Sequence, residues 1–335
     1  MTISDIAGLS KPLSKLIGVV SEGIGTLYRP TKIRREAAAH AHAQQIAALA
    51  KAKTDIKVRE LQFDALSQRV ETLLSERPDL AERARMRVLT REIEGVLNIE
   101  AIADAAATEL PNDVSDKPLD ADWRRKFFLE AENVCDADMQ LLWGKILAGE
   151  IAAPGTFSVR SLDTLRRLSR SEAEIFQRAC SLAMKDGWIA LPSQDLNVAL
   201  ELFGLPFDSI LALRDAGLLQ PSDTLAKIFK TGIPLNQIMG AAPSQNPIPA
   251  IKIRVELNNN GVLIQLTSPA ETFHVPALIF TKSGTELQRL INDAANPQYL
   301  TSIGEALRRQ GVTAKRGTTT QVREGLFLTT FEQDL

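Results

Sequence analysis

Few residues of this sequence have the chemistry of metal ligands or nucleophiles, because it contains only three histidines and two cysteines. His40 and His42 lie two residues apart in a helical pattern, whereas ligands on one helix face are three or four residues apart. His274 stands alone near the start of a predicted strand. Cys135 and Cys180 have apolar neighbours in helical patterns, which predicts two buried thiols in a reducing compartment. We therefore expect no metal site and no cofactor.

The acidic pairs of the sequence have a structural explanation. Asp136 or Asp138 precedes a helical pattern as its predicted N-cap, and Ser171 with Glu174 predicts a capping box. The sequence has no glycine-rich phosphate loop, no cysteine–histidine metal spacing and no nucleophile elbow. We expect a protein without catalytic residues. An unrecognised hydrolase stays open as an alternative, because the sequence does not show which carboxylates face one another.

The elements that would position a site centre on residues 140–162. Apolar residues here follow the three-and-four spacing of one helix face, and Trp143 is expected to be buried against the phenylalanines at 127, 128 and 176. Gly149 is predicted to end this helix, and Ser158 to cap the next one. We interpret the stretch as a structural motif made of Gln140, Trp143, Gly149, Glu150, Pro154, Gly155 and Ser158.

Residues 1–30 contain a predicted amphipathic helix that is followed directly by basic residues. The apolar face of this helix has three interpretations. It docks on the protein's own core, it lies on an anionic membrane surface with the basic residues as a collar, or it fills a groove of a partner protein. The membrane- or partner-binding residues would be Leu13, Leu16, Ile17, Val20, Ile24, Arg29, Lys32, Arg34 and Arg35.

Residues 31–110 predict two long helical arms, either a helical hairpin or an oligomeric stalk. In the first arm, Leu49, Ile56, Phe63 and Val70 repeat every seven residues, while the alternating heptad positions are polar. This pattern points toward a coiled coil without establishing one. Pro78 starts the second arm, over 78–109. The polar, proline-containing segment 111–121 is predicted to link the two halves of the chain.

Beyond this segment, the patterns predict a helical block over 122–186 and an α+β module over 187–335. The fold class is therefore mainly α, with long N-terminal helices and a smaller α+β C-terminal module. The order of helices and strands from 172 to 292 resembles a winged helix. Its predicted second helix, residues 206–219, carries Arg214 against Asp208 and Asp215, so the module is expected to bind protein. A DNA-binding winged-helix regulator is the alternative.

The composition limits where the protein acts. Residues 1–59 carry ten basic and four acidic side chains, a net charge of +6, whereas the whole chain has a net charge of -2. No apolar run approaches the roughly 20 residues of a membrane span, and no signal peptide pattern is present. We expect a cytoplasmic protein, with the basic N-terminal helix as a route to the periphery of the inner membrane.

Several stretches together resemble an uncharacterised bacterial domain-of-unknown-function family. They are Pro12–Ile17 with Tyr28–Pro30, the stretch from Asp138 to Ser158, and Thr281–Leu287 with Tyr299–Leu300. The same N-terminal and C-terminal patterns are more loosely similar to alpha-type abortive-infection proteins. This resemblance implies a non-enzymatic bacterial protein that takes part in phage exclusion. Its partners would be a second copy of the chain or a phage protein, and an anionic membrane surface is a further candidate. Nucleic acid is not an expected partner.

Overall fold

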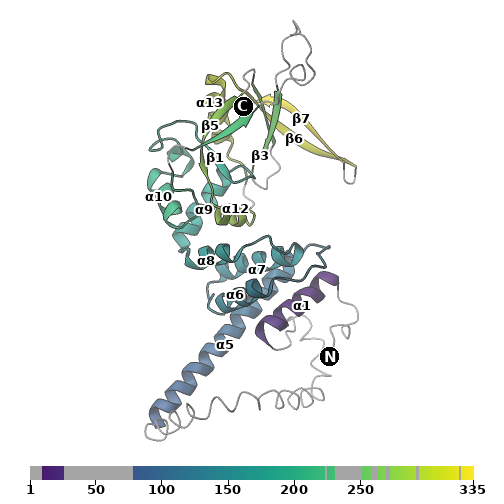
Figure 1. The fold of residues 1–335 in the computed structure, drawn as a ribbon, viewed down its shortest axis with the longest axis vertical. Coiled ribbons are helices and arrows are strands. Elements are labelled where there is room, and N and C mark those ends of the chain that lie inside the picture. Colours follow the sequence, from purple (N-terminus) through teal and green to yellow (C-terminus); the bar gives the residue numbers. More distant parts are fainter. Residues whose placement is uncertain are drawn as a thin grey trace, which may run out of the picture. The chain divides into compact units, whose positions relative to one another are not determined.

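The computed structural model describes residues 10–25, 78–222, 225–230, 251–257, 263–268, 272–291, 294–323 and 326–335. Within these ranges the chain forms nine α-helices and seven β-strands, which confirms a mainly α fold with a smaller α+β part. The chain divides into two compact units, Met1–Thr156 and Phe157–Leu335. We call them unit 1 and unit 2 (Figure 1).

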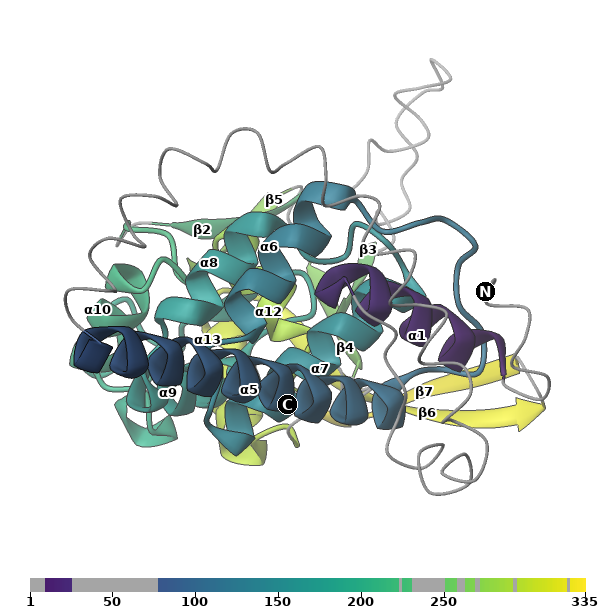
Figure 2. The same cartoon turned by 90° about the horizontal axis from the view of Figure 1, so that it is seen from below.

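Unit 1 is helical in its described part. Its helices are α1 (Lys11–Ile24), α5 (Pro78–Glu109), α6 (Ala121–Ala131) and α7 (Ala137–Ala152). The C-terminal half of α5 packs along α7, and α1 contacts α5, α6 and α7. The N-terminal half of α5 extends beyond these neighbours (Figures 1 and 2). The second predicted arm, 78–109, is therefore confirmed as a helix. The first arm, 31–77, lies outside the described residues.

Close packing of α7 on α5 depends on one glycine. A Cβ atom at Gly144 would lie 2.6 Å from the Cβ of Ala105 and 2.9 Å from the backbone nitrogen of Ala106. Real Cβ atoms do not come this close, so only glycine permits the contact. Trp143, the next residue, is fully buried, and its ring centroid lies 5.2 Å from that of Phe127. The predicted burial of Trp143 is confirmed, and Phe127 is the ring against which it packs.

Helix α1 is docked on unit 1. Leu16, Ile17 and Val20 are buried. The Nζ atom of Lys15 donates hydrogen bonds to the backbone carbonyls of Ser115, Lys117 and Ile151, at 2.7, 2.9 and 3.0 Å. Burial lowers the pKa of this ammonium group, and the three carbonyls are the polar groups that compensate for its lost hydration. Helix α1 therefore covers the core of unit 1 with its apolar face.

The segment 111–121, predicted to link two halves, lies inside unit 1. Val114 and Leu119 are buried, and the backbone nitrogen of Ser115 donates to the carbonyl of Ala152. A polar, proline-containing composition marks irregular backbone, but it does not show whether neighbouring helices cover that backbone. The boundary between the two compact units falls instead between Thr156 and Phe157, within the predicted block 122–186.

Unit 2 combines short helices with two antiparallel sheets. Its helices are α8 (Val159–Arg167), α9 (Arg170–Leu182), the 3₁₀ helix η3 (Glu201–Phe203), α10 (Phe207–Asp215), α12 (Lys282–Gln288) and α13 (Pro297–Arg309). Its strands are β1 (Trp188–Ala190), β2 (Ala226–Lys230), β3 (Ile251–Glu256), β4 (Leu263–Ser268), β5 (Thr272–Ile279), β6 (Thr313–Arg323) and β7 (Leu326–Asp334). The strand order is β1-β5-β2 in one sheet and β3-β4-β6-β7 in the other.

The strand pairs follow the alternation of the sequence. The alternating apolar residues of 251–257 and 262–266 predict a hairpin. The structure confirms it, because β3 pairs antiparallel with β4 from Ile251 opposite Ser268 to Glu256 opposite Leu263. In the other sheet, β5 lies between β1 and β2 and pairs antiparallel with both. The core of unit 2 contains Tyr299 of α13, whose hydroxyl donates to the carbonyl of Ala190 at 2.8 Å. Burial raises the pKa of that hydroxyl.

Several helix ends differ from the prediction by a few residues. Asp122 precedes Trp123 and is the N-cap that the sequence predicts for α6, but the cap is Asp120, because its carboxylate accepts the Trp123 N–H. The capping box belongs to Ser169 and Glu172, two residues before the predicted pair Ser171 and Glu174. Competing serine and acidic residues lie within one helical turn, so the spacing alone does not select the pair. The predicted N-cap Asp136 is confirmed.

Two predictions about helix extent are wrong. Gly149 lies inside α7, which continues to Ala152. The positive φ of 95° belongs to Gly155, where the chain turns. The sequence pattern of residues 195–203 also predicts a helix, but the structure has a series of turns that ends in η3. There the Asp195 carboxylate accepts the backbone N–H of Asn197, a local bond that competes with helix formation.

Cys135 is exposed and not buried as predicted, since it lies in the loop between α6 and α7, whereas Cys180 is buried. Among the residues that the structure describes, no helix is long and apolar enough to cross a membrane.

Candidate functional site

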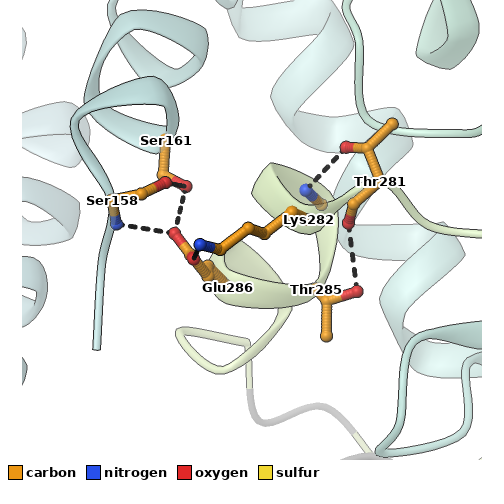
Figure 3. A network of polar contacts seen from close by, with 7 residues as sticks. Ser158, Ser161, Thr281, Lys282, Thr285 and Glu286 are labelled. Atoms are coloured by element: carbon orange, nitrogen blue, oxygen red, sulfur yellow. Dashed lines mark hydrogen bonds and ion pairs between the residues drawn. The ribbon is translucent and has the colours of Figure 1, made fainter. Parts of the chain in front are cut away.

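The stretch that ends at Ser158 and the stretch Thr281–Leu287, which both carry the family resemblance, meet in unit 2. Ser158, at the start of α8, and Glu286, in α12, are 128 residues apart, and the backbone N–H of Ser158 donates to Glu286 Oε2 at 2.7 Å. The hydroxyl of Ser161 donates to the same oxygen at 2.5 Å. Figure 3 shows the carboxylate pointing at the first turn of α8. We call Ser158, Ser161, Lys282 and Glu286 the α8–α12 joint.

The joint is a helix cap supplied by a distant residue. Ser158 holds the predicted N-cap position of α8, but its side chain makes no capping bond. Its hydroxyl lies 3.2 Å from that of Ser161 instead. The first N–H groups of a helix lack internal partners, and the positive end of the helix dipole favours an anion there. The Glu286 carboxylate supplies both that acceptor and that charge.

The Glu286 carboxylate is buried, whereas the ion pair that it forms with Lys282 is long and exposed to solvent. Glu286 is 6% exposed, and Ser161 is fully buried. The Nζ atom of Lys282 lies 3.8 Å from Oε1 of Glu286, and the lysine side chain is 76% exposed. Hydrogen bonds from Ser158 and Ser161 therefore stabilise the buried charge more than the lysine does, because an exposed ion pair is screened by water.

The start of α12 is fixed by its own motif residues. Thr281 Oγ1 accepts the N–H of Gly284 at 3.1 Å and donates to the carbonyl of Gly217 at 2.6 Å. The hydroxyl of Thr285 donates back to the Thr281 carbonyl at 3.0 Å (Figure 3). A Cβ atom at Gly284 would lie 2.3 Å from the carbonyl oxygen of Leu218. Thr281 and Gly284 therefore seat α12 against the turn at 217–218, and Thr285 stabilises the first turn of α12 itself.

The α8–α12 joint does not have the geometry of an activated serine nucleophile. A serine nucleophile needs an accessible hydroxyl and a base that is available to take its proton. Ser161 has no exposed surface, and the carboxylate that faces it also accepts the N–H of Ser158. Among the residues that the structure describes, no group of three histidine, cysteine or acidic side chains could hold a metal ion.

Comparison with known families decides the assignment of the chain. The model of the family described as "Protein of unknown function (DUF2806)" matches residues 82–304. This chain belongs to the DUF2806 family. Searches of curated proteins and of solved structures found no match to it. The predicted membership of an uncharacterised family is thereby confirmed. The matched range includes both segments that meet at the α8–α12 joint.

The other motif residues of this DUF2806 chain make contacts inside unit 1. The amide of Gln140 donates to Asn98 Oδ1 at 3.1 Å and to the carbonyl of Val134 at 2.9 Å, which joins α7 to α5. Glu150 is 1% exposed, and it accepts the N–H of Gly155 at 2.6 Å. Pro154 and Gly155 form the turn between these groups. The motif thus positions helices around the end of α7.

The predicted membrane- or partner-binding residues fall into two groups. Leu16, Ile17 and Val20 are buried in unit 1, and Leu13 and Ile24 are half-buried. Their apolar face is occupied by the protein's own core, which is the first of the three interpretations. The four basic residues of the collar, Arg29, Lys32, Arg34 and Arg35, lie outside the described residues.

The exposed side of α10 is acidic and apolar. Asp208, Leu211 and Asp215 are exposed at the three-and-four spacing of one helix face. The guanidinium of Arg214, the basic side chain of this helix, donates to the carbonyl of Ser222 at 2.9 Å. Leu202 of η3 is 88% exposed and Val198 is 53% exposed. We call Asp208, Leu211 and Asp215 the α10 face.

Sequence reasoning gave no role to Glu286, Asn98 or Lys15. Glu286 lies in a stretch that carries the family resemblance, but nothing near it in sequence shows that it caps α8. Asn98 Nδ2 donates to the carbonyl of Glu132 at 2.8 Å, and Lys15 holds a segment 100 residues away. In a sequence, an asparagine or lysine in a helical pattern is normally assigned to the solvent-exposed side of the helix. Only the tertiary structure shows that other elements cover these side chains.

Proposed function

We propose that this DUF2806 chain is a non-enzymatic bacterial defence protein that acts in phage exclusion by binding another protein through unit 2. The chemistry of the α10 face carries the proposal. An exposed helix face that combines Leu211 with the carboxylates of Asp208 and Asp215 suits a protein partner and repels nucleic acid. The loose similarity to alpha-type abortive-infection proteins supplies the biological setting.

Strand order supports a winged-helix-like module in unit 2. The chain runs α9, β1, η3, α10, β2 and β5, and the sheet order is β1-β5-β2. A helix, a short strand, two further helical segments and a β-hairpin-like pair in this order are the parts of a winged helix. The strands β3 and β4 lie between β2 and β5 in the sequence, in the place of the first wing.

The same arrangement is the observation that favours a DNA-binding regulator as the second candidate. In such proteins the helix equivalent to α10 enters the major groove with basic and polar side chains. Here that helix exposes Asp208, Leu211 and Asp215. Two carboxylates facing the phosphate backbone oppose binding, since affinity for DNA comes mainly from neutralised phosphates.

A duplex-binding assay separates these two candidates. We expect fluorescence anisotropy with random-sequence duplex to show no binding by the full chain at about 50 mM salt, where phosphate contacts are strongest. Duplex binding that persists at about 150 mM salt, with a steep salt dependence, would favour the DNA-binding regulator and contradict the protein-binding proposal.

Phage challenge tests the defence role. Cells that express the chain should lower the plating efficiency of at least one phage in a broad panel by tenfold or more, compared with an empty vector. Leu211→Asp should remove this protection, because it places a third carboxylate in the α10 face. Leu129→Asp is the matched control, since Leu129 is 56% exposed on α6 of unit 1. The proposal fails if no phage is restricted, or if both variants protect like the wild type.

Membrane contact is a separate arm of the proposal. Because Leu16, Ile17 and Val20 are buried in unit 1, α1 would have to leave its site before inserting into lipid. We expect no flotation of the full chain with phosphatidylcholine vesicles, nor with vesicles that contain phosphatidylglycerol. Flotation that requires phosphatidylglycerol, and that is lost in Ile17→Asp, would instead support a membrane-surface helix.

A further inference from the structure

The backbone around the C-terminal end of α7 forms a cage for a small cation. The carbonyl oxygens of Ser115, Lys117 and Ile151 lie 2.7, 2.9 and 3.0 Å from a single atom, the Nζ of Lys15. We call these three oxygens the carbonyl cage. Lys15 belongs to α1, whereas the cage belongs to α7 and to the segment that joins α5 to α6. Backbone carbonyls that converge on one point replace the hydration shell of a bound cation.

Contacts that do not involve α1 fold the backbone of the cage. The backbone nitrogen of Ser115 donates to the carbonyl of Ala152 at 3.0 Å, which fastens the segment to the end of α7. The backbone nitrogen of Lys117 donates to the hydroxyl of Ser115 at 3.1 Å. Ile151 lies in the last turn of α7, where carbonyls lack partners inside the helix and the helix dipole favours a positive charge. The cage can therefore form without α1.

Two carboxylates near the cage favour a cation at this position. Burial lowers the pKa of Lys15, and the negative charges of Asp116 and Glu150 oppose this lowering. Both carboxylates also have contacts elsewhere, since Asp116 pairs with Lys11 at 2.8 Å and Glu150 accepts the N–H of Gly155 at 2.6 Å. The three cage oxygens that contact the Nζ of Lys15 belong to neutral carbonyls.

The size of the cage does not suit the common divalent ions. Magnesium lies about 2.0–2.1 Å and calcium about 2.3–2.6 Å from its oxygen ligands, and both normally bind carboxylates. The cage oxygens are 2.7–3.0 Å from the ammonium nitrogen that they surround. Potassium is a larger cation, similar in size to ammonium, and proteins hold it with rings of backbone carbonyls. The cage therefore suits a monovalent cation of the size of potassium or ammonium.

Solvent reaches the cage from the side of the segment that joins α5 to α6. In this segment Asp116 and Lys117 are exposed and Ser115 is half-buried, and Lys15 of α1 is half-buried as well. A cation from solution can therefore enter the cage once Lys15 has left it, without passing through the core of unit 1.

We propose that the carbonyl cage is a binding site for potassium or ammonium, which α1 fills with the ammonium group of Lys15 while it is docked. When α1 is released, a cation from solution takes the place of Lys15, so the two occupants compete. A ligand that binds only the released state shifts the equilibrium toward release. The cation concentration therefore controls how often the apolar face of α1 leaves the core of unit 1. This inference does not depend on the function proposed for unit 2.

Hydrogen exchange of the α1 amides in the full chain is the first test. We compare potassium chloride and ammonium chloride with tetramethylammonium chloride at the same ionic strength, because tetramethylammonium is too large for the cage. Potassium or ammonium should speed the exchange of residues 11–24 at least about twofold, and whichever of them does so is the ligand. Equal exchange in all three salts would overturn the proposal.

Two variants separate the cage from general salt effects. In Lys15→Ala the cage is open to a cation in both states of α1, so potassium or ammonium should no longer speed exchange. Lys11→Ala is the matched control, since Lys11 also lies on α1 but pairs with the exposed Asp116 outside the cage. Lys11→Ala should respond to the salts as the wild type does. Faster exchange of α1 in potassium or ammonium chloride that persists in Lys15→Ala would contradict competition for the cage.

Thermal unfolding of Lys15→Ala measures cation binding directly. Potassium or ammonium chloride should raise its melting temperature by at least about 2 °C relative to tetramethylammonium chloride, whereas the wild type should show no gain. Adding Ser115→Ala, which removes the hydroxyl that accepts the Lys117 N–H, should reduce the gain. An equal gain in wild type and Lys15→Ala, or none in either, overturns the proposal. If Lys15→Ala does not fold, hydrogen exchange of the wild type and Lys11→Ala decides alone.

Discussion

The two units hold their central helices by different kinds of contact. In unit 1, α7 packs on α5 through Gly144 and the buried ring of Trp143. In unit 2, α12 is joined to α8 through the Glu286 carboxylate, which accepts from Ser158 and Ser161. An apolar contact loses stability in proportion to the volume removed, whereas a buried polar contact loses it when donors are left without an acceptor. The comparison therefore predicts different responses to substitution.

The largest effect is expected at Trp143. Trp143→Ala should lower the free energy of unfolding by about 3–5 kcal/mol, because it leaves a cavity beside Phe127. Urea unfolding followed by circular dichroism measures this change. Trp143→Phe is the control, since it keeps a ring at the contact and should cost far less. Equal losses in the free energy of unfolding for the two variants would show that the stability does not depend on the volume of the side chain at position 143.

Glu286 should give the next largest effect. Glu286→Ala leaves the Ser158 N–H and the Ser161 hydroxyl without their acceptor, at a cost of about 2–3 kcal/mol in the free energy of unfolding. Glu286→Gln keeps an acceptor oxygen of nearly the same shape, so it should cost about 1 kcal/mol.

Lys282→Ala is the control for charge at the joint. The pair is 3.8 Å long and the lysine side chain is mostly exposed, so the loss should stay below about 0.5 kcal/mol. A lysine variant as damaging as Glu286→Ala would mean that the ion pair, and not the helix cap, holds the joint.

Gly144→Ala should have an intermediate to small effect in unit 1. The new Cβ would lie 2.6 Å from the Cβ of Ala105, so α5 and α7 must separate, at about 1–2 kcal/mol in the free energy of unfolding. Adding Ala105→Gly removes one of the two clashes and should recover part of the loss. No recovery in the double variant would place the strain at the backbone of Ala106 alone.

The smallest effect concerns pH and the capping box of α9. Hydrogen bonds from the Ser169 hydroxyl and N–H hold the pKa of the Glu172 carboxyl below its ordinary value of 4.5. A carboxyl whose pKa is lower in the folded state stabilises that state above the unfolded pKa, and this contribution is lost as the pH falls through the folded value. Glu172→Gln should therefore flatten the decline in melting temperature below about pH 4.5. Identical pH profiles for wild type and variant would contradict this role.

Local patterns predicted most helices and one hairpin, but not which residue of a crowded set makes a given contact. The helix over 78–109 and the hairpin from 251 to 266 follow from periodicity and turn residues. The capping box was predicted at Ser171, two residues after its position at Ser169. Ser169 and Ser171 both lie at the start of α9 with a glutamate three residues later. Small differences in the backbone path that leads into the helix decide which of them is the N-cap.

The sequence by itself determined most of the helices and one hairpin, because side-chain periodicity and capping chemistry act over a few residues. It also determined that Trp143 is a core residue. Tertiary structure alone decided that Glu286 caps a helix 128 residues away, and that the apolar face of α1 covers unit 1 while Met86, Leu89 and Ile93 of α5 are exposed. The α1 and α5 faces have the same kind of pattern in the sequence. Among the residues that the structure describes, the folded chain brings a covering surface to the apolar face of α1 and not to the apolar residues in the N-terminal half of α5.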